Sequence, residues 1–157
     1  MRNTAQEISQ IPDGFIPFPN QDGFILSIAP IYFRPAGPDV EPAMGFVVLE
    51  KHLNPVGICH GGMMMTLMDM ACGQAVLHNV GRRVFPPSIQ LNADFLQPAR
   101  LGEWLESRFD FVKTTPRTGF ANGYLVGPNG PVIRVNGICK LPRDDDARFR
   151  RSGGDIF

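Results

Sequence analysis

The feature that most constrains the fold is a long, nearly uncharged apolar run in the middle of the chain. Asp69 is the only Asp, Glu, Lys or Arg between Lys51 and Arg82. The run opens on a glycine pair at residues 61–62 and is closed by Gly81, which suits a left-handed C-cap. It therefore predicts one long helix that is apolar on nearly every side and buried on most of them.

Strand patterns surround this helix. Residues 88–96 alternate apolar and polar side chains, the period of two that is typical of a half-covered strand. An extended piece is expected near residues 24–33, and a hairpin connection at residues 127–131. The other strands are expected over residues 44–50, 104–112, 120–126 and 132–141. A strand, one apolar helix and four further strands predict an α+β architecture, with an antiparallel sheet around the helix.

Composition excludes several classes of function. A chain of 157 residues with a formal net charge of zero fits a single domain without a long-range field for polyanions, so we expect no nucleic-acid partner. The apolar run is too short to span a bilayer and the N-terminus lacks a signal-peptide pattern, so we expect no membrane partner and a cytoplasmic location. The three cysteines have no Cys-x-x-Cys spacing, which predicts buried thiols and no metal site.

Composition also divides the sequence into three parts. Residues 1–39 are rich in Pro and Gly and are expected to form an N-terminal arm packed on the core. Residues 40–142 hold the helix and the main strands and are expected to form the folded domain. Residues 143–157 carry clustered aspartates and arginines and are expected to form a charged C-terminal tail.

The lone carboxylate of Asp69 needs a physical reason. Moving such a charge into an apolar setting costs several kcal/mol unless it is paired, or else its pKa rises until it is neutral. Either outcome makes a poised acid or base. The structural alternatives are a carboxylate that reaches solvent on the helix surface, or one held in an interface by an arginine.

The start of the helix has the character of an oxyanion site. At His60-Gly61-Gly62 the backbone N–H groups lack intrahelical partners, and the missing Cβ atoms let a ligand oxygen approach. Alternatively, the glycines only allow tight packing of the helix start. Asp69 lies eight residues beyond Gly61, roughly 12 Å along the helix, so one chain cannot bring both groups to one carbonyl. Two antiparallel helices related by a two-fold axis could, which predicts a homodimer.

The motif Asn54-x5-His60-Gly61-Gly62-x6-Asp69, with the later Ser88-x6-Phe95-x2-Pro98, resembles the PaaI-type branch of the hotdog-fold thioesterases. The resemblance covers about residues 44–141. It implies a hotdog fold over residues 40–142, with an antiparallel β-sheet wrapped around one long central helix. It also implies an acyl-coenzyme A thioesterase without metal or cofactor, since coenzyme A enters as part of the substrate. Homodimers, often paired into homotetramers, would carry the active sites at the dimer interface.

The resemblance implies a role for each residue of the motif. Asp69 would be the general base or nucleophile, and the Gly61 backbone N–H would polarise the thioester carbonyl. Asn54 would assist that carbonyl or the lytic water, although an Asx-type turn residue before Pro55 is an alternative. Ser88 would orient the water, or is an ordinary residue at a strand edge.

Further residues are implied to contact coenzyme A or the acyl group. His60 would shape the turn, and Met65 belongs to a run of methionines that lines an acyl pocket or packs in the core. Basic residues would bind the coenzyme A phosphates beside the tunnel mouth, or are solvated surface charges. The expected contact residues are His60, Gly62, Met65, Gln97, Pro98, Arg100, Lys113, Arg117 and Thr118.

Two rival functions remain. A hydratase or dehydratase of the same fold normally needs a histidine paired with an acidic residue, and His52, His60 and His78 show no such pairing in the sequence. A non-catalytic acyl-coenzyme A sensor would keep the pocket without turnover. The acyl group itself cannot be ranked from the sequence, because fold alone does not set the substrate.

Overall fold

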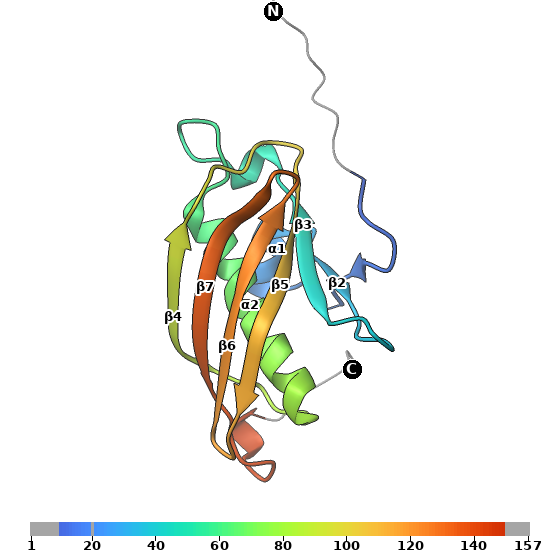
Figure 1. The fold of residues 1–157 in the computed structure, drawn as a ribbon, viewed down its shortest axis with the longest axis vertical. Helices are drawn as coiled ribbons and strands as arrows, with labels where there is room; N and C mark the ends of the chain where they lie inside the picture. The colour runs from blue at the N-terminus through green and yellow to red at the C-terminus, as the bar shows by residue number, and fades with distance from the viewer. Residues whose placement is uncertain (1–9, 20, 150–157) are drawn as a thin grey trace, which may run out of the picture.

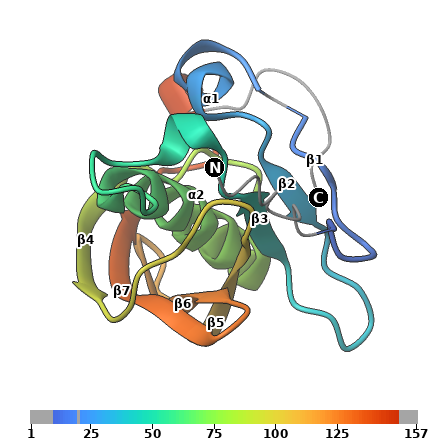
Figure 2. The ribbon, with the colours of Figure 1, turned by 90° about the horizontal axis from the view of Figure 1, so that it is seen from above.

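The computed structural model describes residues 10–19 and 21–149, with helix α2 (Gly61–Val80) at its centre. Within these residues, an antiparallel sheet of seven strands in the order β1-β2-β3-β5-β6-β7-β4 wraps around the helix (Figure 1, Figure 2). The strands are β1 (Ile16–Pro17), β2 (Tyr32–Arg34), β3 (Ala43–Val47), β4 (Ser88–Phe95), β5 (Trp104–Thr114), β6 (Thr118–Gly127) and β7 (Gly130–Lys140). The predicted α+β fold, a sheet wrapped around one central helix, is confirmed.

The predicted bounds of the helix agree with the structure. α2 begins at Gly61, and Gly81 follows it as a left-handed C-cap with a φ of 63°. The Gly81 N–H donates to the Leu77 carbonyl oxygen at 2.9 Å. Most of the side chains of the helix are buried, but Met65, Thr66 and Asp69 are only half-buried. The helix is therefore covered on most sides and keeps one partly open stripe.

One expectation about secondary structure is wrong. Residues 24–28, expected in an extended piece, belong to the short helix α1 (Gly23–Ile28). Ile25 and Ile28 both pack against the core. Residues three apart share one face of a helix but point to opposite sides of a strand, so this packing favours the helix. The end of the expected piece does form a strand, β2.

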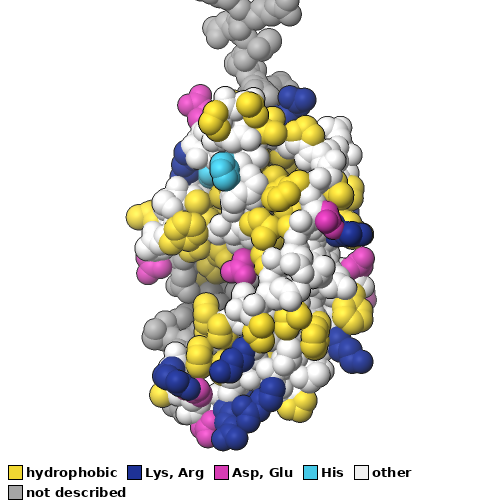
Figure 3. Space-filling model, turned by 90° about the vertical axis from the view of Figure 1, so that its left-hand side faces the viewer, with side chains coloured by type: hydrophobic (Ala, Val, Ile, Leu, Met, Phe, Trp, Pro, Cys, Tyr) yellow, Lys and Arg dark blue, Asp and Glu magenta, His cyan; other side chains and the backbone are white. Residues whose placement is uncertain are grey.

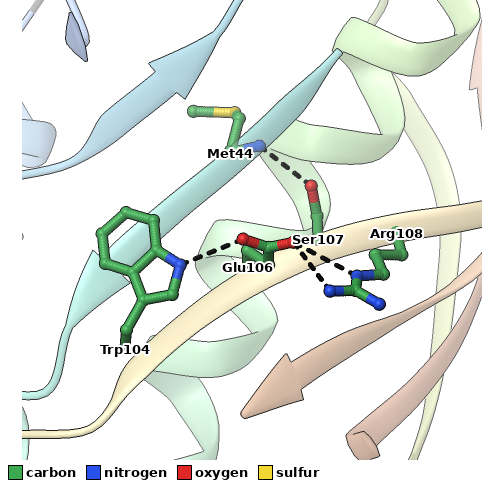
Figure 4. A network of polar contacts seen from close by, with 5 residues as sticks. All are labelled: Met44, Trp104, Glu106, Ser107 and Arg108. Atoms are coloured by element: carbon green, nitrogen blue, oxygen red, sulfur yellow. Dashed lines mark hydrogen bonds and ion pairs between the residues drawn. The ribbon is translucent and has the colours of Figure 1, made fainter. Parts of the chain in front are cut away.

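A polar network fastens β3 to β5 (Figure 4). Trp104 Nε1 donates to Glu106 Oε2 at 3.1 Å, and Arg108 Nε donates to Glu106 Oε1 at 3.2 Å. The Ser107 hydroxyl oxygen accepts from the Met44 N–H at 2.9 Å and so links the two strands. The network holds the sheet together where β3 leads on to β2 and β1.

Part of the expected N-terminal arm lies along this side of the sheet. The ring of Phe15 packs edge-on against Trp104, with 4.9 Å between ring centroids. Of the expected C-terminal tail, Ala147–Phe149 form a 3₁₀ turn. None of the helices in the described ranges is both long and apolar enough to cross a membrane. The arm and tail residues that fall outside the described part of the chain are 1–9, 20 and 150–157.

Strand β4 ends the sheet next to the open stripe of α2. Within the described chain it pairs only with β7, so its other edge is free. Ile89 and Phe95 are 62% and 57% exposed on this strand. Figure 3 shows hydrophobic side chains spread over the middle of this face. A free edge with exposed apolar side chains is the kind of surface that pairs with another chain.

A buried histidine fixes the segment that leads into α2. His52 is 3% exposed, its Nδ1 accepts from the Leu49 N–H at 3.1 Å, and its Nε2 lies 2.9 Å from the Ile28 carbonyl oxygen. The His52 carbonyl oxygen accepts from the His60 N–H at 2.7 Å. Nδ1 must be unprotonated to accept, so the neutral ring, with its proton on Nε2, satisfies both contacts. His52 thus joins α1 to the turn before α2.

The burial of His52 makes folding stability depend on pH. Desolvation lowers its pKa from the ordinary value of 6.5. The unfolded chain therefore binds this proton more readily, and the stability that the neutral ring contributes above pH 6.5 is lost as the pH falls below it. We expect His52→Gln to reduce the fall in the free energy of unfolding between pH 7.5 and pH 5.5, measured by urea denaturation. The slope that one group can add is at most about 1.4 kcal/mol per pH unit.

His78 supplies the matched control for this prediction because its side chain is exposed near the end of α2. His78→Gln should leave the pH dependence of unfolding as it is in the wild type. An equal pH dependence in the wild type and in His52→Gln would show that the neutral His52 ring is not what couples folding to pH.

Candidate active site

The first turn of α2 leaves one N–H group for a ligand. His60 is the N-cap, and its Nδ1 accepts from the Gly62 N–H at 2.8 Å. The His60 carbonyl oxygen accepts from the Met63 N–H at 2.9 Å. In the described part of the chain the Gly61 N–H makes no hydrogen bond. His60 therefore shapes the turn, as the resemblance implies, and Gly61 carries the available donor.

The ring of Phe95 lies beside this donor. A Cβ built on Gly61 would come within 3.0 Å of two ring carbons of Phe95, which is tighter than most Cβ contacts. The end of β4 thus packs directly on the start of α2. The absence of a side chain at Gly61 is what permits this close approach.

Asp69 and Ser88 meet at the other end of β4. The Ser88 hydroxyl donates to Asp69 Oδ1 at 2.5 Å. Asp69 is half-buried and makes no ion pair with a described residue. No arginine of residues 10–19 and 21–149 therefore pairs with Asp69, and the serine hydroxyl holds the carboxylate in place.

A β-bulge aims Ser88 at Asp69. Ser88 pairs with the buried Cys139, whereas Leu91 pairs with Gly137, so both lie on the helix side of the sheet despite their odd separation. The register shift between Ser88 and Gln90 accounts for this change of side. Simple alternation would have placed Ser88 on the outer side with Gln90.

The three cysteines are buried thiols without a role as nucleophiles. All the cysteines are free and buried, as predicted. Burial raises the pKa of Cys59 to about 12 and that of Cys139 to about 11, and it also raises the pKa of Cys72. Asp69 adds to the rise at Cys72 and Cys139 through its negative charge. The thiolate forms are therefore scarce at neutral pH.

Asn54 has the geometry of an Asx-type turn residue, the structural alternative to a role in catalysis. Its Oδ1 accepts from the Val56 N–H at 3.1 Å and from the Ile58 N–H at 3.3 Å, as in an Asx-type turn. The Asn54 Nδ2 group has no partner among the described residues. The turn therefore uses the side-chain oxygen, and only the amide nitrogen is left to contact a ligand.

Six of the residues expected to bind coenzyme A fall into two separate groups. One group follows β4 and consists of Gln97, Pro98 and Arg100, and the other lies at the β5–β6 turn and consists of Lys113, Arg117 and Thr118. Gln97 Nε2 donates to the carbonyl oxygens of Asn129 at 3.3 Å and Pro131 at 2.8 Å, which ties the segment after β4 to the β6–β7 hairpin. The Thr118 N–H donates to the Thr115 hydroxyl oxygen at 3.0 Å within the β5–β6 turn. Met65 is partly buried against the core. The exposed members of the two groups are Pro98, Arg100, Lys113 and Arg117.

These two groups do not flank one opening within a single chain. The end of β4 pairs with β7 at Ile133, whereas Thr118 pairs with Lys140. Seven residues of β7 separate the two points, roughly 23 Å at the rise of a strand. The expectation of a shared tunnel mouth is therefore not met by one chain alone, because the groups lie at opposite ends of the sheet.

The sequence reasoning missed His52, whose carbonyl oxygen holds the His60 N–H. An available signal was a histidine in an apolar setting close to the His60-Gly61-Gly62 motif.

Across residues 10–19 and 21–149, no three His, Cys, Asp or Glu side chains are grouped so that they could hold a metal ion.

The sequence is similar to a thioesterase family model and to one protein provisionally named an esterase. A family model described as the Thioesterase superfamily matches residues 56–123, which include Gly61, Asp69 and Ser88. A Pseudomonas aeruginosa protein, PA0474, which is provisionally named an esterase, is 28% identical over 132 residues. The alignment covers 84% of this chain and 98% of that protein.

Solved structures share the fold. Zebrafish thioesterase superfamily member 2 has a TM-score of 0.65 and 24% identity, covering 78% of this chain and 89% of its own. A mutant of the phenylacetic acid degradation protein PaaI from Thermus thermophilus has a TM-score of 0.62 and 22% identity, covering 71% and 93%.

A hypothetical thioesterase from Streptococcus pneumoniae, solved with coenzyme A, has a TM-score of 0.58 and 20% identity, covering 71% of this chain and 83% of its own. Sequence and structure thus agree on one group of proteins. The chain has the hotdog fold that its sequence predicts, which it shares with PaaI proteins of known structure, and residues 56–123 are similar to the Thioesterase superfamily.

Proposed function

We propose that the protein is an acyl-coenzyme A thioesterase whose active sites form between two copies of the chain. The observation that carries the proposal is the open stripe of α2, which holds the unbonded Gly61 N–H at one end and the Asp69–Ser88 pair further along. Each site would combine the Gly61 donor of one subunit with the Asp69 carboxylate of its partner.

The chemistry follows from these two groups. The thioester carbonyl oxygen accepts from the Gly61 N–H, which stabilises the negative charge that develops on attack. Asp69 takes a proton from the attacking water, or attacks the carbonyl carbon itself, with Ser88 holding its orientation. When water attacks, the carbon–sulfur bond breaks, the sulfur takes up the proton that Asp69 removed, and the acid and the coenzyme A thiol are released. When Asp69 attacks, the same bond breaks to give a mixed anhydride and the coenzyme A thiolate, which takes a proton from solvent, and water then hydrolyses the anhydride to free the acid and Asp69. No cofactor takes part in this scheme.

Two features support an assembly of at least two subunits. Gly61 and Asp69 belong to one unbroken helix, roughly 12 Å apart along its axis. β4 leaves its free edge and exposed apolar side chains beside that stripe. A two-fold axis at this edge would reverse the partner's β4 and bring the partner's Asp69 toward Gly61.

The same symmetry would bring the two basic groups together. Reversal of β4 would place the Arg100 segment of one subunit near the Lys113–Thr118 turn of the other. Both segments could then contact the phosphates of one coenzyme A molecule, for which arginine and lysine are well suited. The bound coenzyme A of the Streptococcus pneumoniae protein supports this class of substrate.

The histidines disfavour the rival hydratase. His60 Nδ1 is occupied by the Gly62 N–H, and both ring nitrogens of His52 are engaged below the surface. His78 lies near the far end of α2. None of them pairs with a carboxylate among the described residues, whereas Asp69 lies on the open stripe.

Asp69→Asn should leave folding intact and lower turnover at least about 100-fold, because the amide keeps the shape but removes the base or nucleophile. The measurement is thiol release from short aliphatic, long aliphatic and aryl coenzyme A esters. Asp94→Asn is a suitable control, since Asp94 lies on β4, the strand that carries Ser88, but pairs with Arg134 at 2.6 Å. Wild-type turnover in Asp69→Asn would exclude the mechanism, and tight binding without any turnover in the wild type would favour a sensor.

The shared site can be tested by subunit mixing. Gly61→Pro removes the N–H group at the first helical position, where proline is tolerated, while the control Gly61→Ala keeps it. Dimers of Gly61→Pro alone or Asp69→Asn alone should be inactive. A purified mixed dimer, selected through two different affinity tags, would contain one intact site and should recover about half of the wild-type activity. An inactive mixed dimer would show that both groups act within one chain.

A further inference from the structure

A cavity lies on the α1 side of the proposed oxyanion turn. Its volume is about 370 Å³, and it is formed between α1, the segment before α2 and the first turns of α2. Phe24 and Ile28 of α1, with Leu53 and Met63, supply its apolar walls. His60 and Gly62, the neighbours of Gly61 on either side, belong to its lining.

We propose that this cavity binds the acyl group of the thioester and that α1 forms its wall. The inference rests on the proposed function, because Gly61 must hold the thioester carbonyl. Gly62, next to the Gly61 donor, lines the cavity, and the Phe95 ring packs near Gly61 itself. The acyl group would then extend toward α1, and the coenzyme A portion would leave on the β4 side toward Arg100.

One residue, His52, holds both α1, which forms the wall of the cavity, and the turn that carries the Gly61 N–H. The His52 ring contacts the carbonyl oxygen of Ile28, the last residue of α1, at 2.9 Å, and the His52 carbonyl oxygen accepts from the His60 N–H at 2.7 Å. The Lys51 ammonium group donates to the Ala29 carbonyl oxygen just beyond α1. α1 is therefore fixed relative to the oxyanion turn and can limit the length of an acyl group that binds between them.

The exposed side chains of α1 fit this role. Phe24 and Leu26 are 65% and 64% exposed, although both are large apolar residues. Phe24 lines the cavity, so a bound acyl group would cover part of its ring. Leu26 does not line it. The two residues therefore provide a test residue and a matched control on a single helix.

The volume of this open cavity gives an approximate size for the part of a ligand that it would cover. At about 30 Å³ for a group the size of a water molecule, the cavity has space for about a dozen heavy atoms. The occupant is thus an apolar acyl group of medium size, such as an aliphatic chain of up to about twelve carbons or an aryl acyl group.

The test uses binding as its readout, in the Asp69→Asn background so that no ligand is consumed. Titration calorimetry would compare free coenzyme A with coenzyme A esters of two to sixteen carbons and with benzoyl-coenzyme A. Affinity should rise with chain length, by up to about fourfold per buried methylene, and level off near twelve carbons. An affinity for dodecanoyl-coenzyme A no greater than that for free coenzyme A would overturn the inference.

Phe24→Ala should weaken the binding of dodecanoyl-coenzyme A by at least about tenfold and leave free coenzyme A unchanged. Leu26→Ala should leave both affinities within about twofold of the parent. Ile28→Trp, which narrows the cavity from the same wall, should favour short acyl groups over long ones. Equal effects of Phe24→Ala and Leu26→Ala would overturn the assignment of this cavity.

These outcomes can be told apart from failure of the proposed function. If the protein with Asp69 intact hydrolyses no ester, yet Phe24→Ala selectively weakens acyl binding, the thioesterase proposal fails and the acyl site stands. If the wild type hydrolyses its esters but the two α1 variants behave alike, only the acyl site fails. Thermal unfolding of each variant shows whether it has kept the native fold.

Discussion

The structure depends on the burial of a helix that has almost no polar side. Because α2 lacks an amphipathic pattern, solvent cannot cover one half of it, and the sheet has to curve around it. The wrapping is incomplete on the side of β4, where Asp69 lies. The same gap that exposes the one charged residue of the helix also exposes its bonding partner Ser88. Fold and candidate site therefore have a common origin.

Much of this could be predicted because it follows from local pattern. The uncharged run and Gly81 define α2, and the eight-residue spacing from Gly61 to Asp69 excludes a site within one chain whatever the tertiary details. The contact of Ser88 with Asp69 could not be derived from alternation, which places Ser88 on the outer side. The β-bulge turns the Ser88 side chain toward the helix. The resemblance to a family, and not periodicity, identified Ser88 as a candidate site residue.

Other features depend on contacts between distant parts of the chain. α1 forms because Ile25 and Ile28 reach the core together, and no capping side chain marks its start. His52 is important through its partners in two other segments, which a sequence does not reveal. Likewise, the basic segments around Arg100 and Arg117 are close in the sequence, but the register of β7 places them at opposite ends of the sheet. In each case tertiary packing, and not local sequence preference, determines the conformation or the position of the residues.

The bulge in β4 lets one short strand obey two different alternation rules. From Leu91 onward, odd-numbered residues face the helix, and the apolar side of the strand is set by packing. At Ser88 the parity is reversed, so a hydroxyl faces the same way without interrupting that apolar side. The orientation of Ser88 toward Asp69 is therefore independent of the exposed apolar side chains along the free edge of β4. Either can change in the course of evolution without forcing a change in the other.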